Sequence, residues 1–289
     1  MYTAPLALLV APDLPSKESQ RTYECAWRFY SQWLAAQKLE VVRVRPKHIQ
    51  LYLAKLRDDG QVKASIGRAL TVIRSLYSRV VTDEHMQANP AREVKGPRVD
   101  STPKTPWIRD EGEIEKLMNV HEHETSWFKR RDRLIVRMAL GLGWRRAEVA
   151  KVTVEDIDGD AIGVVVKGGK RELFGLPDFL AEEIFEWRQF ASIEYGALFP
   201  RRPDDPRPIT GAIVYRIVRQ SCAHVGIDVV PPHALRRTAV SYLRENGVGL
   251  KPCQLMLGHA QEATTGRYDK ARDARANKPG ELLGKLVHG

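Results

Sequence analysis

Apolar residues recur every three or four positions in three segments of the first hundred residues. The segments cover residues 21–37, 46–60 and 64–81, and each places its large apolar side chains on one face of a helix. The second segment begins on a proline, which suits a first helical turn, and stops at a glycine. The pattern therefore predicts an all-helical module over residues 1–97.

The pattern changes after a segment rich in proline and basic residues. Residues 98–106 lack periodicity and predict an extended linker. Residues 107–289 begin with helical patterns, continue with short β-rich runs separated by Gly-Asp and Gly-Gly, and return to helical patterns. We therefore expect a mainly α fold of two domains. In the second domain we expect a small antiparallel β-sheet within residues 151–177 and helices over 178–192, 210–223 and 233–246.

Charge and composition narrow the choice of partner. The chain has 289 residues, with 46 lysines and arginines against 36 acidic residues, a formal charge of +10 and a pI near 9.6. A basic surplus of this size favours nucleic acid as the partner, before an anionic membrane. No apolar run approaches the roughly 18 residues that span a bilayer, and the start lacks the basic region of a signal peptide. The three cysteines are widely spaced and suit a reducing cytoplasm.

The run "HEHE", from His121 to Glu124, invites a metal-binding interpretation. Alternating residues do not share a helix face, and the stretch has the composition of a polar connector, so we predict no metal site there. His48, His85 and His224 have no matching partners in the sequence. We expect these three histidines on the surface.

Near the C-terminus, "PPHALRR" places His233 and Arg236 three residues apart at the start of a predicted helix. The His-x-x-Arg spacing arises by chance in a chain of this size, and an ordinary surface helix would explain it equally well. Four further residues in distinctive contexts accompany it. They are Arg145 in "GLGWRRAE", Lys167 in "VVVKGGKRE", and His259 and Tyr268 in "LGHAQEATTGRY".

These motifs, in this order, resemble those of the tyrosine recombinase family, which includes phage integrases and Xer recombinases. The resemblance is close from Arg145 to Ala271 and looser across the N-terminal helices. It implies an all-α, SAM-like core-binding domain followed by an α-rich catalytic domain of the DNA breaking-rejoining fold. The residues that it identifies as catalytic, with the tyrosine as nucleophile, are Arg145, Lys167, His233, Arg236, His259 and Tyr268.

The chemistry of a DNA phosphodiester suits this set of residues. Attack on phosphorus builds negative charge, and guanidinium groups are permanently charged and can hold two phosphate oxygens at once. Histidines can donate hydrogen bonds or move the tyrosine proton, and a lysine suits protonation of the departing deoxyribose oxygen. Because a tyrosyl ester conserves the energy of the phosphodiester bond, we expect neither a nucleotide cofactor nor a metal.

Two positions in the set have neighbours that compete for the same role. Arg146 adjoins Arg145, but only Arg145 stands three residues before Glu148, as the family's pattern requires. The basic residues at positions 170 and 171 compete with Lys167, and they are otherwise candidates for phosphate contact. Arginines in the third predicted helix are further candidates, for which a solvated helix face is the alternative. The DNA-binding candidates are Arg68, Arg74, Arg79, Lys170, Arg171 and Arg237.

The resemblance also implies the partners. We expect a specific double-stranded DNA site, and four protomers that hold two such sites and pass through a Holliday junction in the nucleoid. The free protein is then a monomer or a weak oligomer. The tail, residues 272–289, carries an apolar stripe that is expected to contact a neighbouring protomer. A helix docked on its own domain, or a frayed end, is the alternative. The alternatives are a type IB topoisomerase, which generally lacks the His-x-x-Arg histidine, and a catalytically silent DNA-binding protein.

Overall fold

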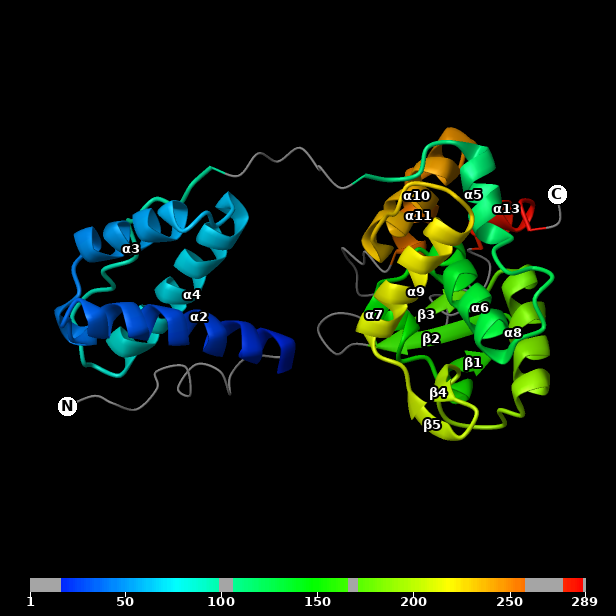
Figure 1. The fold of residues 1–289 in the computed structure, drawn as a ribbon, viewed down its shortest axis with the longest axis horizontal. Helices are drawn as coiled ribbons and strands as arrows, with labels where there is room; N and C mark the ends of the chain where they lie inside the picture. Colours follow the sequence, from blue (N-terminus) through cyan, green and yellow to red (C-terminus); the bar gives the residue numbers. More distant parts are fainter. Residues whose placement is uncertain (1–16, 99–105, 166–170, 258–277, 288–289) are drawn as a thin grey trace. The chain divides into compact units, whose positions relative to one another are not determined.

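The computed structural model describes residues 17–98, 106–165, 171–257 and 278–287. It divides into two compact units, Met1–Pro103 and Lys104–Gly289 (Figure 1). Each unit has its own hydrophobic core.

The first unit consists of helices, as the apolar pattern predicted. Its elements are α2 (Lys17–Ala36), the short 3-10 helix η2 (Val41–Arg43), α3 (Pro46–Asp58) and α4 (Lys63–Thr82). Its core contains a cluster of aromatic side chains, in which the hydroxyls of Tyr30 and Tyr77 lie 3.1 Å apart. Burial raises the pKa of both phenols well above the usual range.

Helix α6 (Trp127–Gly141) is the buried centre of the second unit. Other helices enclose the C-terminal half of α6, so that every residue from Leu134 to Gly141 is buried. No helix in the described part of the chain is long and apolar enough to cross a membrane. The helices in contact with it include α5 (Glu111–Met118), α7 (Arg146–Val149), α8 (Asp178–Ala191), α9 (Gly211–His224) and α10 (Pro232–Glu245).

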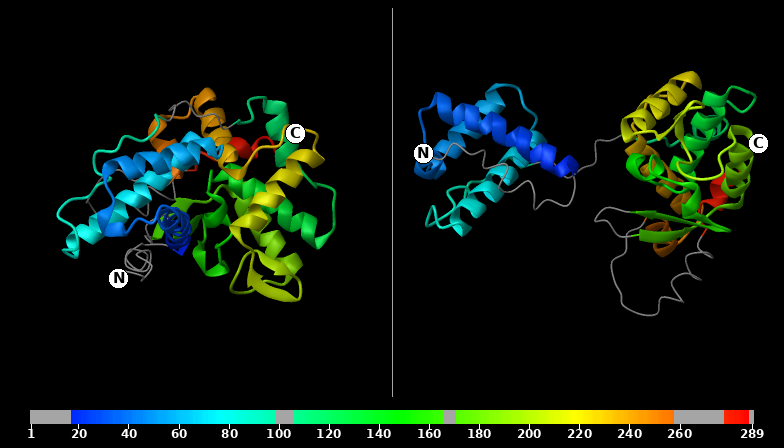
Figure 2. Two further views of the ribbon diagram at one scale, coloured as in Figure 1. Left: turned by 60° about the vertical axis from the view of Figure 1, so that its left-hand side comes forward. Right: turned by 90° about the horizontal axis from the view of Figure 1, so that it is seen from below.

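The predicted β-rich segment forms a three-stranded antiparallel sheet in the order β1-β2-β3, which confirms the small sheet expected from the sequence. Residue Ile162 of β2 pairs with Phe174 of β3. The sheet lies beside the helices, and α11 (Leu250–Met256) contacts β3 (Figure 2). The strands are β1 (Ile157–Asp158), β2 (Ala161–Val165) and β3 (Arg171–Gly175).

A second hairpin, β4 (Pro200–Arg202) and β5 (Asp205–Pro208), did not emerge from the sequence pattern. Its prolines and charged residues disfavour strand structure locally. Tertiary contact compensates, since the Arg131 guanidinium donates hydrogen bonds of 3.1 and 2.7 Å to the carbonyls of Pro200 and Arg201.

Residues 278–287 of the C-terminal segment pack on their own unit, the alternative to the expected contact with a neighbouring protomer. Helix α13 (Glu281–Gly284) lies against α8 and α6 (Figure 1). Leu283 is fully buried, and a Cβ atom on Gly284 would come within 2.7 Å of the Phe179 ring. The physical reason for this packing is that α6 and α8 offer the apolar surface that this stripe needs.

Candidate active site

Arg145 is held in a fixed orientation at the turn between α6 and α7. Its backbone N–H donates to Glu148 Oε2, and its Nη1 donates to Glu148 Oε1, both at 2.7 Å. Glu148 is buried, but 36% of the Arg145 side chain remains exposed. The three-residue spacing noted in the sequence therefore produces an anchored guanidinium that still faces solvent, which supports Arg145 over Arg146.

Arg236 lies one turn into α10 and is 5% exposed. Its Nη1 donates to the Gly143 carbonyl at 2.8 Å, and its Nη2 donates to the Leu257 carbonyl at 2.6 Å. Burial, and after it the positive charge of Arg145, lower the pKa of Arg236 to about 10, and Glu148 opposes this. Two cationic groups are thus held near one another, an arrangement that a bound phosphate would stabilise.

Gly143 makes this approach possible. Its φ is +59°, a left-handed conformation that favours glycine, and a Cβ atom there would lie 2.8 Å from Leu257 Cδ2. A glycine at position 143 therefore allows Leu257 to pack closely against the bend. Its carbonyl accepts the hydrogen bond from Arg236, two residues before Arg145.

His233 is exposed in the first turn of α10, one turn before the buried Arg236. A proline at the helix start sets this first turn. The next residue after Arg236, Arg237, places its guanidinium 5.3 Å from the centre of the Trp107 ring. His233 is thus available to a ligand, whereas Arg237 packs on an aromatic ring.

Trp144 connects the Arg145 bend to the β-sheet. Its ring meets Phe174 of β3 edge to face, at a centroid distance of 5.5 Å, and it is fully buried. The structure gives it a packing role, because it joins the bend to the hairpin of β2 and β3.

Four sequence-predicted residues, Lys167, Lys170, His259 and Tyr268, lie outside the described residues. Arg171, at the start of β3, is exposed and forms a 3.1 Å ion pair with Asp156. Among the described candidates, the structure brings together Arg145 and Arg236, with His233 one turn away on α10.

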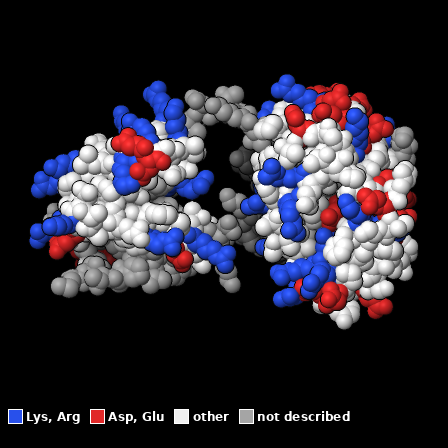
Figure 3. All heavy atoms as spheres, in the orientation of Figure 1, with Lys and Arg blue, Asp and Glu red and all other residues white. Residues whose placement is uncertain are grey.

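A basic surface on α9 did not emerge from the sequence analysis. Arg216 and Arg219 are exposed, and the guanidiniums of Arg146 and Arg219 lie 6.0 and 5.7 Å from the centre of the Tyr215 ring. Figure 3 shows lysine and arginine side chains gathered over this part of the second unit. The available signal was "YRIVR", in which a tyrosine and an arginine are four residues apart and share a helix face.

The three arginines of α4 differ from one another. Arg68 is exposed, and Arg79 forms a 3.2 Å ion pair with Asp83. Arg74 instead donates hydrogen bonds to the carbonyls of Ala91 and Val94, at 3.2 and 2.6 Å. Arg74 was a candidate for phosphate contact or a solvated helix face, and its guanidinium instead holds the segment after α4 against the helix.

Comparison with known proteins adds independent information. Residues 108–275 match the model of the phage integrase family, and residues 14–83 match its N-terminal SAM-like domain. Tyrosine recombinase XerC of Staphylococcus epidermidis is 26% identical over 259 residues, covering 86% of this chain and 85% of that protein. Tyrosine recombinase XerA of Thermococcus kodakarensis is 28% identical over 244 residues, covering 82% of each.

Solved structures share the fold. The structure of a lambda integrase (75-356) dimer bound to a COC' core site superposes with a TM-score of 0.67 at 16% identity, covering 91% of this chain and 96% of that one. XerH bound to a palindromic difH substrate, in a post-cleavage complex, gives a TM-score of 0.69 at 16% identity, covering 93% and 79%.

Proposed function

The chain belongs to the phage integrase family and is a site-specific tyrosine recombinase, and from this membership we propose which of its own residues cleave and rejoin DNA. The reaction exchanges strands between two duplex sites through a Holliday junction. The observation that carries the assignment of roles is the pair Arg145 and Arg236, one anchored by Glu148 and the other by two backbone carbonyls.

The two arginines bind the scissile phosphate. Their guanidiniums donate to its non-bridging oxygens and stabilise the charge that develops when phosphorus becomes pentacoordinate. Because both are already fixed by the protein, little reorganisation is needed as that charge grows. His233, exposed at the start of α10, donates a further hydrogen bond to the same phosphate.

Tyr268, a histidine and Lys167 carry out the bond breaking and the proton transfers. The Tyr268 oxygen attacks phosphorus and loses its proton to a histidine, His259 or His233, while the 5′-oxygen leaves and takes a proton from Lys167. The products are a 3′-phosphotyrosyl bond and a free 5′-hydroxyl. Attack by the 5′-hydroxyl of the partner strand reverses these steps and releases the tyrosine.

Phosphates along the duplex meet the basic surface of α9 and Arg68 of α4. Binding of this kind falls steeply with salt, because each neutralised phosphate releases counterions. A lambda integrase tetramer bound to a Holliday junction has the same fold, with a TM-score of 0.67 and 15% identity, and it supports a tetramer of this chain on two synapsed sites. We place this activity on DNA in the cytoplasm.

The test uses nicked duplexes with randomised flanks, in which cleavage releases a short 5′ product and traps the enzyme on DNA. Protein-linked DNA is recovered without added metal or ATP and sequenced, with Tyr268→Phe in parallel. We expect adducts from the wild type only, and strand exchange between two copies of the recovered site. Adducts from the Tyr268→Phe variant would reassign the nucleophile. Relaxation of supercoils without strand exchange would indicate a topoisomerase.

A further inference from the structure

Two histidines and a glutamate meet where the connection between α5 and α6 touches the end of α9. The rings of His121 and His224 lie 4.4 Å apart, centre to centre, and His121 Nδ1 is 2.9 Å from Glu124 Oε1. One nitrogen or oxygen from each of the three residues lies within 4.8 Å of the others. The local pattern at residues 121–124 predicted no metal and offered no partner for His224, because the third group comes from a helix far along the chain.

We propose that His121, Glu124 and His224 bind one divalent transition-metal ion, for which Zn²⁺ is the best match. Two imidazole nitrogens and one carboxylate oxygen form a ligand set that zinc accepts, with a fourth position for water. Zinc bonds of about 2.0–2.1 Å place tetrahedral ligand atoms roughly 3.3 Å apart. The three groups are therefore close to binding distance, and the exposed His224 and half-buried Glu124 have room to move inwards.

His121 is the fixed member of the cluster. It is 8% exposed, and its backbone φ is +59°. His224 occupies the last turn of α9, where the helix dipole favours a nearby cation.

A lysine already supplies positive charge to this cluster. Lys129 Nζ lies 3.5 Å from His121 Nε2 and 3.9 Å from Glu124 Oε1. Without a metal, the Lys129 ammonium is thus the cation next to the cluster. A divalent ion would compete with this ammonium, and Lys129, with 38% of its side chain exposed, can withdraw into solvent. Metal affinity should therefore rise when Lys129 is neutralised.

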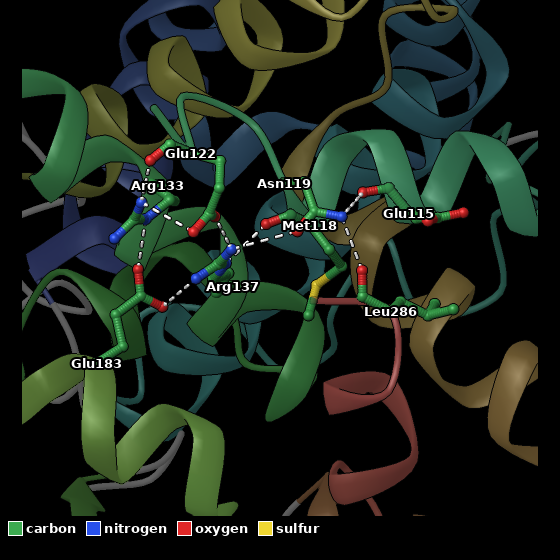
Figure 4. A network of polar contacts seen from close by, with 8 residues as sticks. All are labelled: Glu115, Met118, Asn119, Glu122, Arg133, Arg137, Glu183 and Leu286. Carbon is green, nitrogen blue, oxygen red and sulfur yellow. Dashed lines mark hydrogen bonds and ion pairs between the residues drawn. The ribbon is translucent and has the colours of Figure 1, made fainter. Parts of the chain in front are cut away.

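A network of ion pairs fixes the connection between α5 and α6, which contains His121 and Glu124 (Figure 4). Arg133 and Arg137 each bridge Glu122 to the buried Glu183 of α8, and Arg137 Nε donates to the Met118 carbonyl at 2.7 Å. This network holds the connection against α6 and α8. The cluster is thus built on a rigid frame, as a metal site requires.

The site adjoins the C-terminal segment. Asn119 Nδ2 donates to the Leu286 carbonyl at 2.8 Å (Figure 4). Val287 lines the same hollow as His121 and His224. A metal here would join the α5–α6 connection to α9 beside the docked tail. It shares no residue with the candidate catalytic set, so its effect is on the stability of the second unit.

The decisive experiment is a competition titration of the tag-free, chelator-treated full chain with Zn²⁺ against a chromophoric chelator, without DNA. We expect one tight site in the wild type and at least a tenfold loss of affinity in His224→Gln, since His224 is exposed and its replacement leaves the core intact. His123→Gln is the matched control, because His123 lines the same hollow without belonging to the cluster, and its affinity should equal that of the wild type. Lys129→Gln should bind more tightly.

Equal affinity in the wild type and His224→Gln would overturn the proposal. Loss of binding in Cys25→Ser instead would also overturn it and assign the metal to the exposed cysteine. Thermal unfolding provides a second readout, because an ion that binds only the folded state raises its melting temperature in proportion to the logarithm of its concentration. We expect that rise in the wild type and in His123→Gln but not in His224→Gln; the same rise in all three would contradict the site.

Discussion

Glu148 holds Arg145 through both carboxylate oxygens, one on the backbone N–H and one on the guanidinium. It has no direct role in bond breaking, so it is a positioning residue. We predict that Glu148→Ala lowers the rate of DNA cleavage about a hundredfold, the order of loss that follows a misplacement of about 1 Å. The measurement is the rate of covalent adduct formation on a nicked duplex.

Glu148→Gln should lose less than Glu148→Ala, because one amide oxygen still accepts a hydrogen bond. Both variants should bind DNA about as well as the wild type, since phosphate contacts elsewhere on the surface are unchanged. An equal loss of binding and cleavage would instead indicate a misfolded bend.

Gly143→Ala should destabilise the second unit by about 3 kcal/mol, from the left-handed backbone together with overpacking against Leu257. Gly226→Ala is the matched control, because Gly226 also has a positive φ, of +73°, but open space around its Cβ position. It should cost only about 1 kcal/mol. Urea unfolding measures both, and equal values would show that contact with Leu257 is unimportant.

Arg68→Ala should alter DNA binding, whereas Arg74→Ala should alter the stability of the fold. Removing the exposed Arg68 should reduce the slope of log affinity against log salt by about 1 and leave stability unchanged. Removing Arg74 should destabilise the first unit by about 1–3 kcal/mol, because the Ala91 and Val94 carbonyls lose their donors. Binding titrations at several salt concentrations and urea unfolding separate the two. A salt effect from Arg74→Ala in a fully folded variant would restore it as a phosphate contact.

Leu283→Ala should lower the unfolding free energy of the free chain by about 2–5 kcal/mol, because this fully buried side chain packs on its own unit. Lys285→Ala, in the same segment but exposed, is the control and should have no effect. Unchanged stability of Leu283→Ala, together with weaker assembly on DNA, would mean that the segment serves a neighbouring protomer.

The first unit should lose stability at alkaline pH. Burial raises the pKa of Tyr30 and Tyr77 in the folded state, whereas tyrosines of the unfolded chain lose their protons near pH 10. The unfolded state therefore holds fewer protons above that pH, so stability is fully present below pH 10 and declines as pH rises beyond it. Urea unfolding between pH 8 and 11 measures this, and Tyr77→Phe should flatten the decline. A flat profile in the wild type would contradict the burial of these phenols.

The local pattern of apolar residues and turn residues was sufficient to predict most of the helices and the three-stranded sheet. Helical spacing predicted α2, α3, α4, α8, α9 and α10, and glycine turns between β-branched runs predicted the sheet of β1, β2 and β3. These elements follow from side-chain period and turn chemistry, which are properties of neighbouring residues. The order of motifs from Arg145 onwards likewise identified the family without any coordinates.

Contacts between distant residues were decided only by the tertiary structure. Arg74 and Arg68 lie on one predicted helix, yet only folding turns Arg74 towards the Ala91 carbonyl. The prolines of β4 and β5 oppose a hairpin until Arg131 binds its backbone. The meeting of His121 with His224 depends on how α9 packs against α6. Sequence spacing sets which residues share a local face, whereas the burial of apolar surface decides which faces meet, and that depends on the whole chain at once.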